Sequence, residues 1–331
     1  MKRSLLKACQ IEKQSAGARA LLNHPDLVGM GYGPKERNQG LTDDAAIKLY
    51  VRKKEKDLKK LGKRVLPRKL GKVQTDVVEI APLQAFSKNS HRWRPVLGGT
   101  SGAVYVEGRT FTGTLGMAVQ GWGRTRGRFF ILSNNHVLAH INEAEIGAPI
   151  LQPGTFDGGD LEKDVIGSLY QYVPLQLGDP QKNWAEQPRN RVDAALAEVN
   201  FWNVSREIFG LGYPKGWRTK EKVQQAVIGA GGRMRVQKIG AATAYTTGYV
   251  SDLSYDGWVD YGNGRLAFFE NQLLISPGSF SGVGDSGAIV FDMDQRIISL
   301  LYGGSETHTV ANHIEDVRQQ LPFFEFFEPR V

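Results

Sequence analysis

The sequence predicts a mainly β protein in which two packed antiparallel β-barrels follow a small α+β N-terminal domain. Glycine is abundant, with 39 of 331 residues, and short apolar runs are punctuated by Gly, Asn and Asp, which favours a β-rich architecture. From about residue 96 these runs fall into two clusters, separated by an irregular stretch over residues 201–232, and a segment of helical spacing follows at residues 312–321. Two clusters of strands with a closing helix indicate two packed barrels.

The first 95 residues have a different pattern and are expected to fold separately. Apolar spacing predicts a short helix and then three strands, at residues 14–24, 27–32, 45–51 and 73–80. Residues 87–95 show no periodicity and contain a proline near their end, which is typical of a linker. We therefore expect an α+β domain with its linker over residues 1–95 and the barrel domain over residues 96–331.

Strands of the barrel domain are predicted from short apolar runs bounded by turn residues. The first cluster has them at residues 110–119, 128–133, 165–173 and 194–199. The second cluster has them at residues 234–239, 247–253, 266–275, 288–291 and 297–302. Since ligand sites favour the junction between such units, a functional site is expected in the cleft between the barrels.

The net charge of +8 comes from one basic patch. Residues 52–72 contain eleven Lys or Arg and two acidic residues, a local charge of +9, so the rest of the chain carries −1. Such a patch can bind a polyanion or a protein partner, although it contains no aromatic residue for stacking on single strands. A solvated, Lys-rich surface is the simpler interpretation.

Cysteine usage and hydropathy bear on the cellular compartment. Cys9 is the only cysteine, so the chain can form no internal disulfide, which suits a reducing environment. The first nine residues are basic but lack the apolar stretch of a signal peptide, and no segment approaches membrane-spanning length. The sequence therefore predicts a cytoplasmic protein that does not insert in a membrane.

The most informative segment is Gly-Asp-Ser-Gly at residues 284–287, which runs directly into an apolar strand. Its glycines permit a sharp turn that presents the Ser286 hydroxyl. In such a turn the amides of Gly284 and Ser286 can converge on a developing oxyanion, which a serine nucleophile requires. The alternative is a turn serine without chemistry. Three further serines lie just upstream without this setting, at Ser276, Ser279 and Ser281.

His136 is the candidate base for this serine. It follows an apolar strand that ends in a polar turn, which places an imidazole at a strand end facing the expected cleft. A structural histidine is one alternative. Zinc binding by His136 and His140 is another, but Val137 stands where the zinc-helix motif requires Glu.

Asp193 is the candidate partner that orients the imidazole. It precedes an Ala-Ala-Leu-Ala run that indicates a strand entering the core, and such an aspartate must be partly buried to stabilise an imidazolium. Asp160 and Asp164 compete for the role, but their Gly-Gly-Asp loop is typical of exposed turns. The chain order His, Asp, Ser is that of one of the convergent triads.

These residues resemble the serine peptidases of the chymotrypsin (trypsin-like) fold over about residues 97–322. The matching segments are Ser133-Asn134-Asn135-His136-Val137, Val192-Asp193-Ala194-Ala195-Leu196 and Gly284-Asp285-Ser286-Gly287. The chain is also similar to intracellular bacterial trypsin-like peptidases and the plant narrow-leaf-type proteins. That closer likeness lies in Val28-Gly29-Met30-Gly31-Tyr32-Gly33, in Thr75-Asp76-Val77-Val78-Glu79, and in Leu151-Gln152-Pro153-Gly154 with the Asp-Gly-Gly that follows at 157–159.

The resemblance implies a double β-barrel, a serine endopeptidase that works through an acyl-enzyme, and neither cofactor nor metal. The implied substrate is a protein or peptide, and limited processing of a protein partner is the expected role. The alternative is a catalytically silent adaptor that binds a protein or polyanion through its N-terminal domain. Residues 96–99 (Val-Leu-Gly-Gly) faintly resemble the new N-terminus that secreted zymogens insert against the Asp before the nucleophile; we interpret this as coincidence.

The resemblance also implies a pocket for the substrate side chain before the cleaved bond. The residue six before the nucleophile, Phe280, is expected at its base, and Tyr302, Gly303 and Gly304 along its wall. An apolar base predicts cleavage after small or medium aliphatic residues and not after Lys or Arg, because a buried charge would lack a partner. His308, just beyond the wall, leaves open an alternative in which an acidic side chain is recognised.

Overall fold

The computed structural model describes residues 3–37, 40–55, 57–79, 89–109, 111–322 and 324–326. Its contacts divide the chain into two compact units, Met1–Phe86 and Ser87–Val331. No helix in the described ranges is long and apolar enough to cross a membrane.

The N-terminal unit is a small α+β structure. Its sheet has the order β1-β2-β4-β3, with β1 (Leu27–Arg37), β2 (Gly40–Val51), β4 (Val73–Glu79) and β3 (Lys69–Leu70). The helices and a 3-10 turn are α1 (Arg3–Lys13), α2 (Ala16–Leu21), α3 (Leu58–Leu61) and η1 (Gly62–Arg64). Helix α1 packs against β1 and β2 and buries Cys9 against Ile47 and Leu49. Burial raises the pKa of the Cys9 thiol, which suits a packing role for this side chain.

The basic patch lies on the surface of this unit. Its described Lys and Arg side chains are exposed, and Arg64 forms an ion pair with Asp26 at 2.9 Å. Helix α2 begins where Ser15 accepts a hydrogen bond from the Ala18 amide, a standard N-cap. Helices α1 and α3 were not predicted from the sequence.

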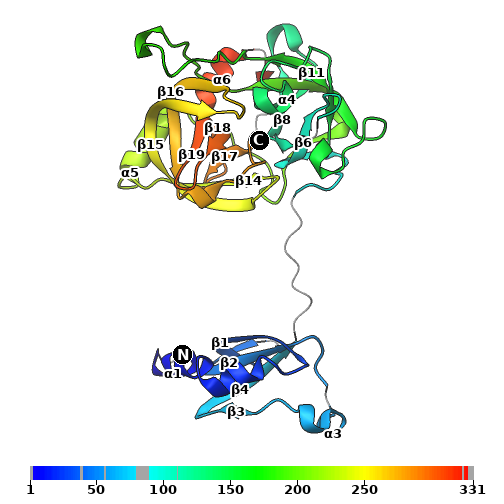
Figure 1. The fold of residues 1–331 in the computed structure, drawn as a ribbon, viewed down its shortest axis with the longest axis vertical. Coiled ribbons are helices and arrows are strands. Elements are labelled where there is room, and N and C mark those ends of the chain that lie inside the picture. Colours follow the sequence, from blue (N-terminus) through cyan, green and yellow to red (C-terminus); the bar gives the residue numbers. More distant parts are fainter. Residues whose placement is uncertain are drawn as a thin grey trace. The chain divides into compact units, whose positions relative to one another are not determined.

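Two curled antiparallel sheets form the larger unit, so the predicted mainly β, chymotrypsin-like double-barrel architecture is confirmed (Figure 1). The first sheet has eight strands in the order β20 (Phe324–Glu325), β8 (Met117–Gly121), β9 (Phe129–Ser133), β12 (Ala195–Val199), β11 (Val165–Tyr172), β10 (Pro149–Leu151), β6 (Thr100–Val104) and β7 (Gly113–Leu115). The second closes into a barrel in the order β14 (Arg235–Gly240), β15 (Ala244–Asp260), β16 (Leu266–Ser276), β19 (Thr309–His313), β18 (Ile297–Gly304) and β17 (Ile289–Asp292).

Shorter elements complete this unit. Two strands pair in parallel, β5 (Val96–Gly98) and β13 (Val204–Ile208). The helices are α4 (Asn135–Leu138), α5 (Lys220–Gly229) and α6 (Ile314–Gln320). The 3-10 turns are η2 (Gly123–Thr125), η3 (Thr155–Asp157), η4 (Trp184–Glu186), η5 (Phe201–Asn203) and η6 (Gly278–Phe280).

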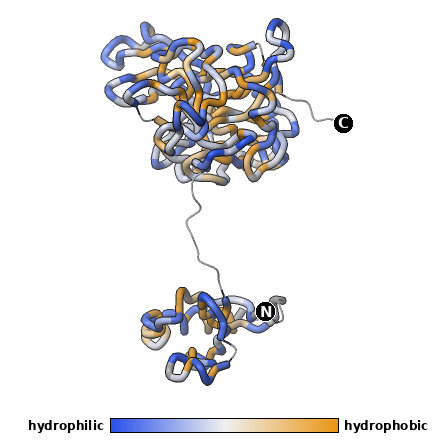
Figure 2. Tube along the Cα trace, turned by 90° about the vertical axis from the view of Figure 1, so that its right-hand side faces the viewer, coloured by the Kyte–Doolittle hydropathy of each residue, from blue (hydrophilic) through white to orange (hydrophobic). Residues whose placement is uncertain are grey.

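One apolar core joins the two barrels. Leu132 and Leu196 of the first barrel pack in the same cluster as Ile289 and Leu300 of the second, and Ile314 of α6 closes it. Figure 2 shows the hydrophobic stretches, in orange, gathered inside this unit and the hydrophilic loops outside. Since burial of apolar area is the main stabilising term, this shared core fixes the cleft between the barrels.

The residues assigned to a linker belong in part to the larger unit. Residues 87 and 88 lie outside the described ranges, but residues 89–95 contact the first barrel. The Trp93 amide donates to Gln152 Oε1 at 2.8 Å, and Arg92 forms an ion pair with Asp164 at 2.8 Å. Asp164 is therefore buried and paired, although the sequence indicated an exposed turn. A sequence pattern cannot reveal such contacts, because each is made by a single side chain and produces no periodicity.

Candidate active site

The turn that carries Ser286 has the geometry that its glycines predict. Gly284 has φ +101° and Gly287 has φ +97°, a region that favours glycine. A Cβ on Gly287 would lie 2.0 Å from the Thr114 carbonyl oxygen of β7, so the turn could not approach the first barrel with any other residue. Thr114 holds the turn in return, because its amide donates to the Ser286 carbonyl at 2.7 Å and its hydroxyl to the Gly284 carbonyl at 2.8 Å.

Two backbone amides of this turn are free. Among the described residues, neither the Gly284 nor the Ser286 amide donates a hydrogen bond within the protein, and both residues line one cavity. Buried amides are nearly always paired, so a pair of free donors beside a serine hydroxyl is suited to an oxygen atom of a ligand.

His136 and Asp193 are brought into direct contact at the edge of the same cavity. His136 stands on the one-turn helix α4 directly after β9, and Asp193 stands just before β12, which is paired with β9. The His136 Nδ1 atom lies 2.5 Å from Asp193 Oδ2, and the His136 amide donates to Asp193 Oδ1 at 3.2 Å. Such a contact orients the ring so that Nε2 is turned toward the cavity.

The Asp193 carboxylate is fully buried and is held by several donors. Besides His136, the Tyr261 hydroxyl donates to Asp193 Oδ2 at 2.8 Å. The backbone is held as well, because Asn134 Nδ2 donates to the Asp193 carbonyl at 2.7 Å and the Asp193 amide donates to Asn312 Oδ1 at 3.0 Å. These bonds offset the cost of removing the carboxylate from water.

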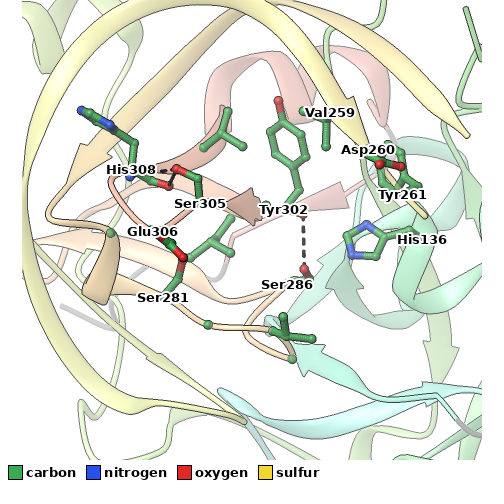
Figure 3. Close-up of a pocket in the computed structure, with 18 of the residues that line it drawn as sticks. His136, Val259, Asp260, Tyr261, Ser281, Ser286, Tyr302, Ser305, Glu306 and His308 are labelled. Carbon is green, nitrogen blue, oxygen red and sulfur yellow. Dashed lines mark hydrogen bonds between the residues drawn. The ribbon is translucent and has the colours of Figure 1, made fainter. Parts of the chain in front are cut away.

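Ser286 faces His136 without a hydrogen bond to it in the described structure (Figure 3). Its Oγ atom donates instead to the Tyr302 carbonyl at 3.2 Å. In structures without substrate, hydrogen bonds of this kind are often long and tighten only when substrate binds.

The cavity has a volume of about 1320 Å³ and is lined by both barrels. The first barrel contributes Thr112, His136 and His140, and the second contributes Tyr261 and Ser286, among others. Burial lowers the pKa of the His140 imidazole. In the described part of the chain no group of three or more His, Cys, Asp or Glu is placed to hold a metal ion.

The residues predicted to line a substrate pocket divide into two groups. Tyr302, Gly303, Gly304 and His308 all line the cavity, although the His308 ring points away from Ser286 in Figure 3. Phe280 does not line it: the side chain is fully buried in the core of the second barrel. Turn η6 explains this, because it directs Phe280 inward.

Ser279 and Ser281, on either side of Phe280, line the cavity in its place. The Ser281 hydroxyl shares a hydrogen bond of 2.6 Å with the Thr309 hydroxyl on β19. A Cβ on Gly304 would lie 3.1 Å from Ser281 Oγ. The slot between Ser281 and Gly304 is therefore narrow.

A second buried ion pair lies directly behind the serine turn, and the sequence analysis missed it. Lys238 on β14 and Asp285 are both fully buried, and Lys238 Nζ lies 2.9 Å from Asp285 Oδ2. Burial lowers the pKa of Lys238, and the Asp285 charge opposes this effect. The sequence did contain a sign of this pair, because Lys238 lies inside an apolar strand and a lysine is seldom buried without a partner of opposite charge.

Comparisons with known proteins find similarity only among solved structures. No family model and no curated protein matches the chain. Protease A of Thermobifida fusca is 12% identical, with 70% of this chain and 98% of that chain covered and a TM-score of 0.44. A chymotrypsin of Cellulomonas bogoriensis is 14% identical (70% and 99% covered, TM-score 0.43).

A glutamic acid-specific serine protease, described as using a histidine triad in substrate binding, is also 14% identical to this chain, with 69% and 99% covered and a TM-score of 0.45. All three of these structures are proteases.

Proposed function

We propose that this protein is a serine endopeptidase in which Ser286 is the nucleophile, His136 the general base and Asp193 the group that orients the base. The observation that carries the proposal is the contact of 2.5 Å between His136 and a fully buried Asp193, on the same cavity as Ser286 and its two free amides. Each part matches a requirement of acyl transfer: a nucleophile, an oriented base and donors for an oxyanion.

The proposed reaction proceeds through an acyl-enzyme. Ser286 Oγ attacks the substrate carbonyl carbon as its proton passes to His136 Nε2, and the carbonyl oxygen gains the negative charge. The amides of Gly284 and Ser286 donate to that oxygen. Collapse of this intermediate breaks the peptide C–N bond, and His136 returns the proton to the leaving amine. Water then repeats the sequence at the ester and releases the acid.

The proposal is tested by covalent labelling with a fluorophosphonate probe, which reacts only with an activated serine. We expect one probe per chain, recovered on the peptide that contains Ser286, and loss of peptide cleavage in proportion to labelling. Unlabelled protein that still binds a protein or polyanion through its N-terminal unit would support the silent adaptor instead.

The substrate is proposed to be a protein or peptide that is cleaved at few sites. The segments at residues 28–33, 75–79 and 151–154 also support a relation to the intracellular bacterial trypsin-like peptidases. The exposed basic patch on the N-terminal unit is suited to an acidic partner or a polyanion, and recruitment of a substrate is the role we propose for it.

A small side chain is expected before the cleaved bond. Ser281 Oγ lies so close to Gly304 that a Cβ there would be 3.1 Å away, and its hydrogen bond to Thr309 holds it in that place, which leaves a narrow slot for the substrate side chain. We therefore predict cleavage after residues such as Ala, Val or Thr in a mixed peptide library, and little after Lys, Arg or Phe. Ser281→Gly should deepen the slot and raise the rate for larger apolar residues. Strong preference of the unaltered protein for Lys or Arg would contradict this assignment.

A further inference from the structure

We propose that Tyr261 is a positioning residue of this site: its hydroxyl, delivered from the second barrel, holds the Asp193 carboxylate in the orientation that aligns His136. The inference rests on the proposed peptidase function and assigns a fourth side chain to it.

The Tyr261 hydroxyl and the His136 ring contact the same carboxylate oxygen. Tyr261 Oη donates to Asp193 Oδ2 at 2.8 Å, and His136 Nδ1 lies 2.5 Å from that atom. The Tyr261 ring also meets the His136 ring edge-on, with centroids 5.4 Å apart and planes at 62°. Tyr261 therefore limits rotation of both partners of the His–Asp pair.

The hydroxyl remains a donor across the working pH range. Burial, and then the charge of Asp193, raise the pKa of Tyr261 well above its usual value. The nearby Tyr302 hydroxyl does not share the task, because it is buried and makes no hydrogen bond to any described residue. Hydrogen bonds to an ionised acceptor are about twice as strong as neutral ones, so this single hydrogen bond restrains the Asp193 carboxylate strongly.

Tyr261 is fixed in the turn of the β15–β16 hairpin, which contacts the first barrel. It directly follows β15, and its amide donates to the Arg265 carbonyl at 2.9 Å across the turn into β16. Arg265 forms an ion pair of 2.8 Å with Glu143 of the first barrel. On the other flank the Gly178 amide donates to the Leu266 carbonyl at 2.8 Å. Packing of the two barrels is thereby coupled to the alignment of His136.

The test is Tyr261→Phe, which keeps the ring and removes the hydroxyl. Loss of one hydrogen bond to a charged group should lower kcat by about tenfold. KM should be nearly unchanged, because the removed hydroxyl contacts Asp193 and the ring that lines the cavity is kept. The hydroxyl now draws part of the Asp193 charge away from His136. Without it the carboxylate binds the imidazolium more strongly, so the acid limb of the pH–rate profile should move to higher pH.

The matched control is Tyr245→Phe. Tyr245 stands on the same strand β15, outside the cavity, and its hydroxyl donates to Gln237 Oε1 at 3.2 Å. The substitution removes one hydrogen bond of a tyrosine hydroxyl that does not contact the active site. We therefore expect kcat and the pH–rate profile to equal those of the unaltered protein. An unchanged kcat and acid limb in Tyr261→Phe, or equal effects of both variants, would overturn the proposal.

A readout independent of activity separates this inference from the peptidase proposal. The proton shared by His136 Nδ1 and Asp193 gives a low-field NMR resonance, which can be followed in a Ser286→Ala background. Tyr261→Phe should shift that resonance and raise the pH at which it titrates, whether or not the unaltered protein is labelled by fluorophosphonate. A resonance unaffected by Tyr261→Phe would reject the positioning role, and absence of labelling would reject only the peptidase function.

Discussion

Ser286→Ala is expected to lower the peptide-cleavage rate about 10⁶-fold and to abolish labelling by fluorophosphonates, because no other group can form the acyl-enzyme. What remains should be the residual catalysis of binding and the oxyanion donors, about 10³–10⁴-fold over water. Asp193→Asn should lower kcat about 10⁴-fold, since an amide favours the wrong tautomer of the imidazole. Turnover of a chromogenic peptide in purified variants measures both effects.

The matched control for this series is Ser276→Ala. Ser276 lies ten residues before the nucleophile, at the end of β16, and does not line the cavity. We expect its rate and its labelling to equal those of the unaltered protein. Near-normal turnover in Ser286→Ala would end the peptidase interpretation.

Lys238→Met should have the largest effect on stability. It leaves the Asp285 charge buried without its ion-pair partner, and removal of one member of such a pair costs about 3–5 kcal/mol of the free energy of unfolding. Activity should fall as well, because Asp285 also binds the Gly282 amide at 2.9 Å and so fixes the turn that carries the Gly284 amide. Denaturant unfolding and peptide turnover measure the two effects.

Arg109→Met is the control for charge removal alone. Arg109 forms an ion pair with Glu143, and the two side chains are 49% and 39% exposed, so its loss should cost only about 1 kcal/mol, as for surface pairs. Adding Asp285→Asn to Lys238→Met should restore part of the stability by removing the unpaired charge. Equal losses in Lys238→Met and Arg109→Met would contradict the assigned role of the buried pair.

The Lys238–Asp285 pair also bears on residues 96–99, which resemble an inserted N-terminus. The Asp285 carboxylate already accepts five hydrogen bonds, from Lys238 Nζ, Thr243 Oγ1 and the amides of Ala242, Thr243 and Gly282. Val96 is itself buried within strand β5. A lysine inside the barrel thus supplies the cation, which supports interpreting the resemblance as coincidence.

Much of the fold was predictable from local pattern. Short apolar runs bounded by turn residues predicted most strands and the double barrel, because the strands of a packed barrel are short and apolar and end at turns. Phe280 was assigned to the wrong place, because its direction depends on the single turn η6. The α1 helix was missed, because its apolar face is short and its core partners lie on β1 and β2.

The sequence by itself determined the residues whose requirements are local. Gly284 and Gly287 mark a turn that needs positive φ, and this requirement can be recognised from the turn's own sequence, because glycine adopts positive φ most readily. Only the tertiary structure decided the partners that come from distant segments: Tyr261 on Asp193, Lys238 on Asp285 and Thr309 on Ser281. Side chains of these kinds are common along any β chain, and their spacing carries no signal. Tyr261 reaches Asp193 because the two barrels pack on a shared core, whereas Lys238 and Thr309 reach their partners because the second sheet closes into a barrel.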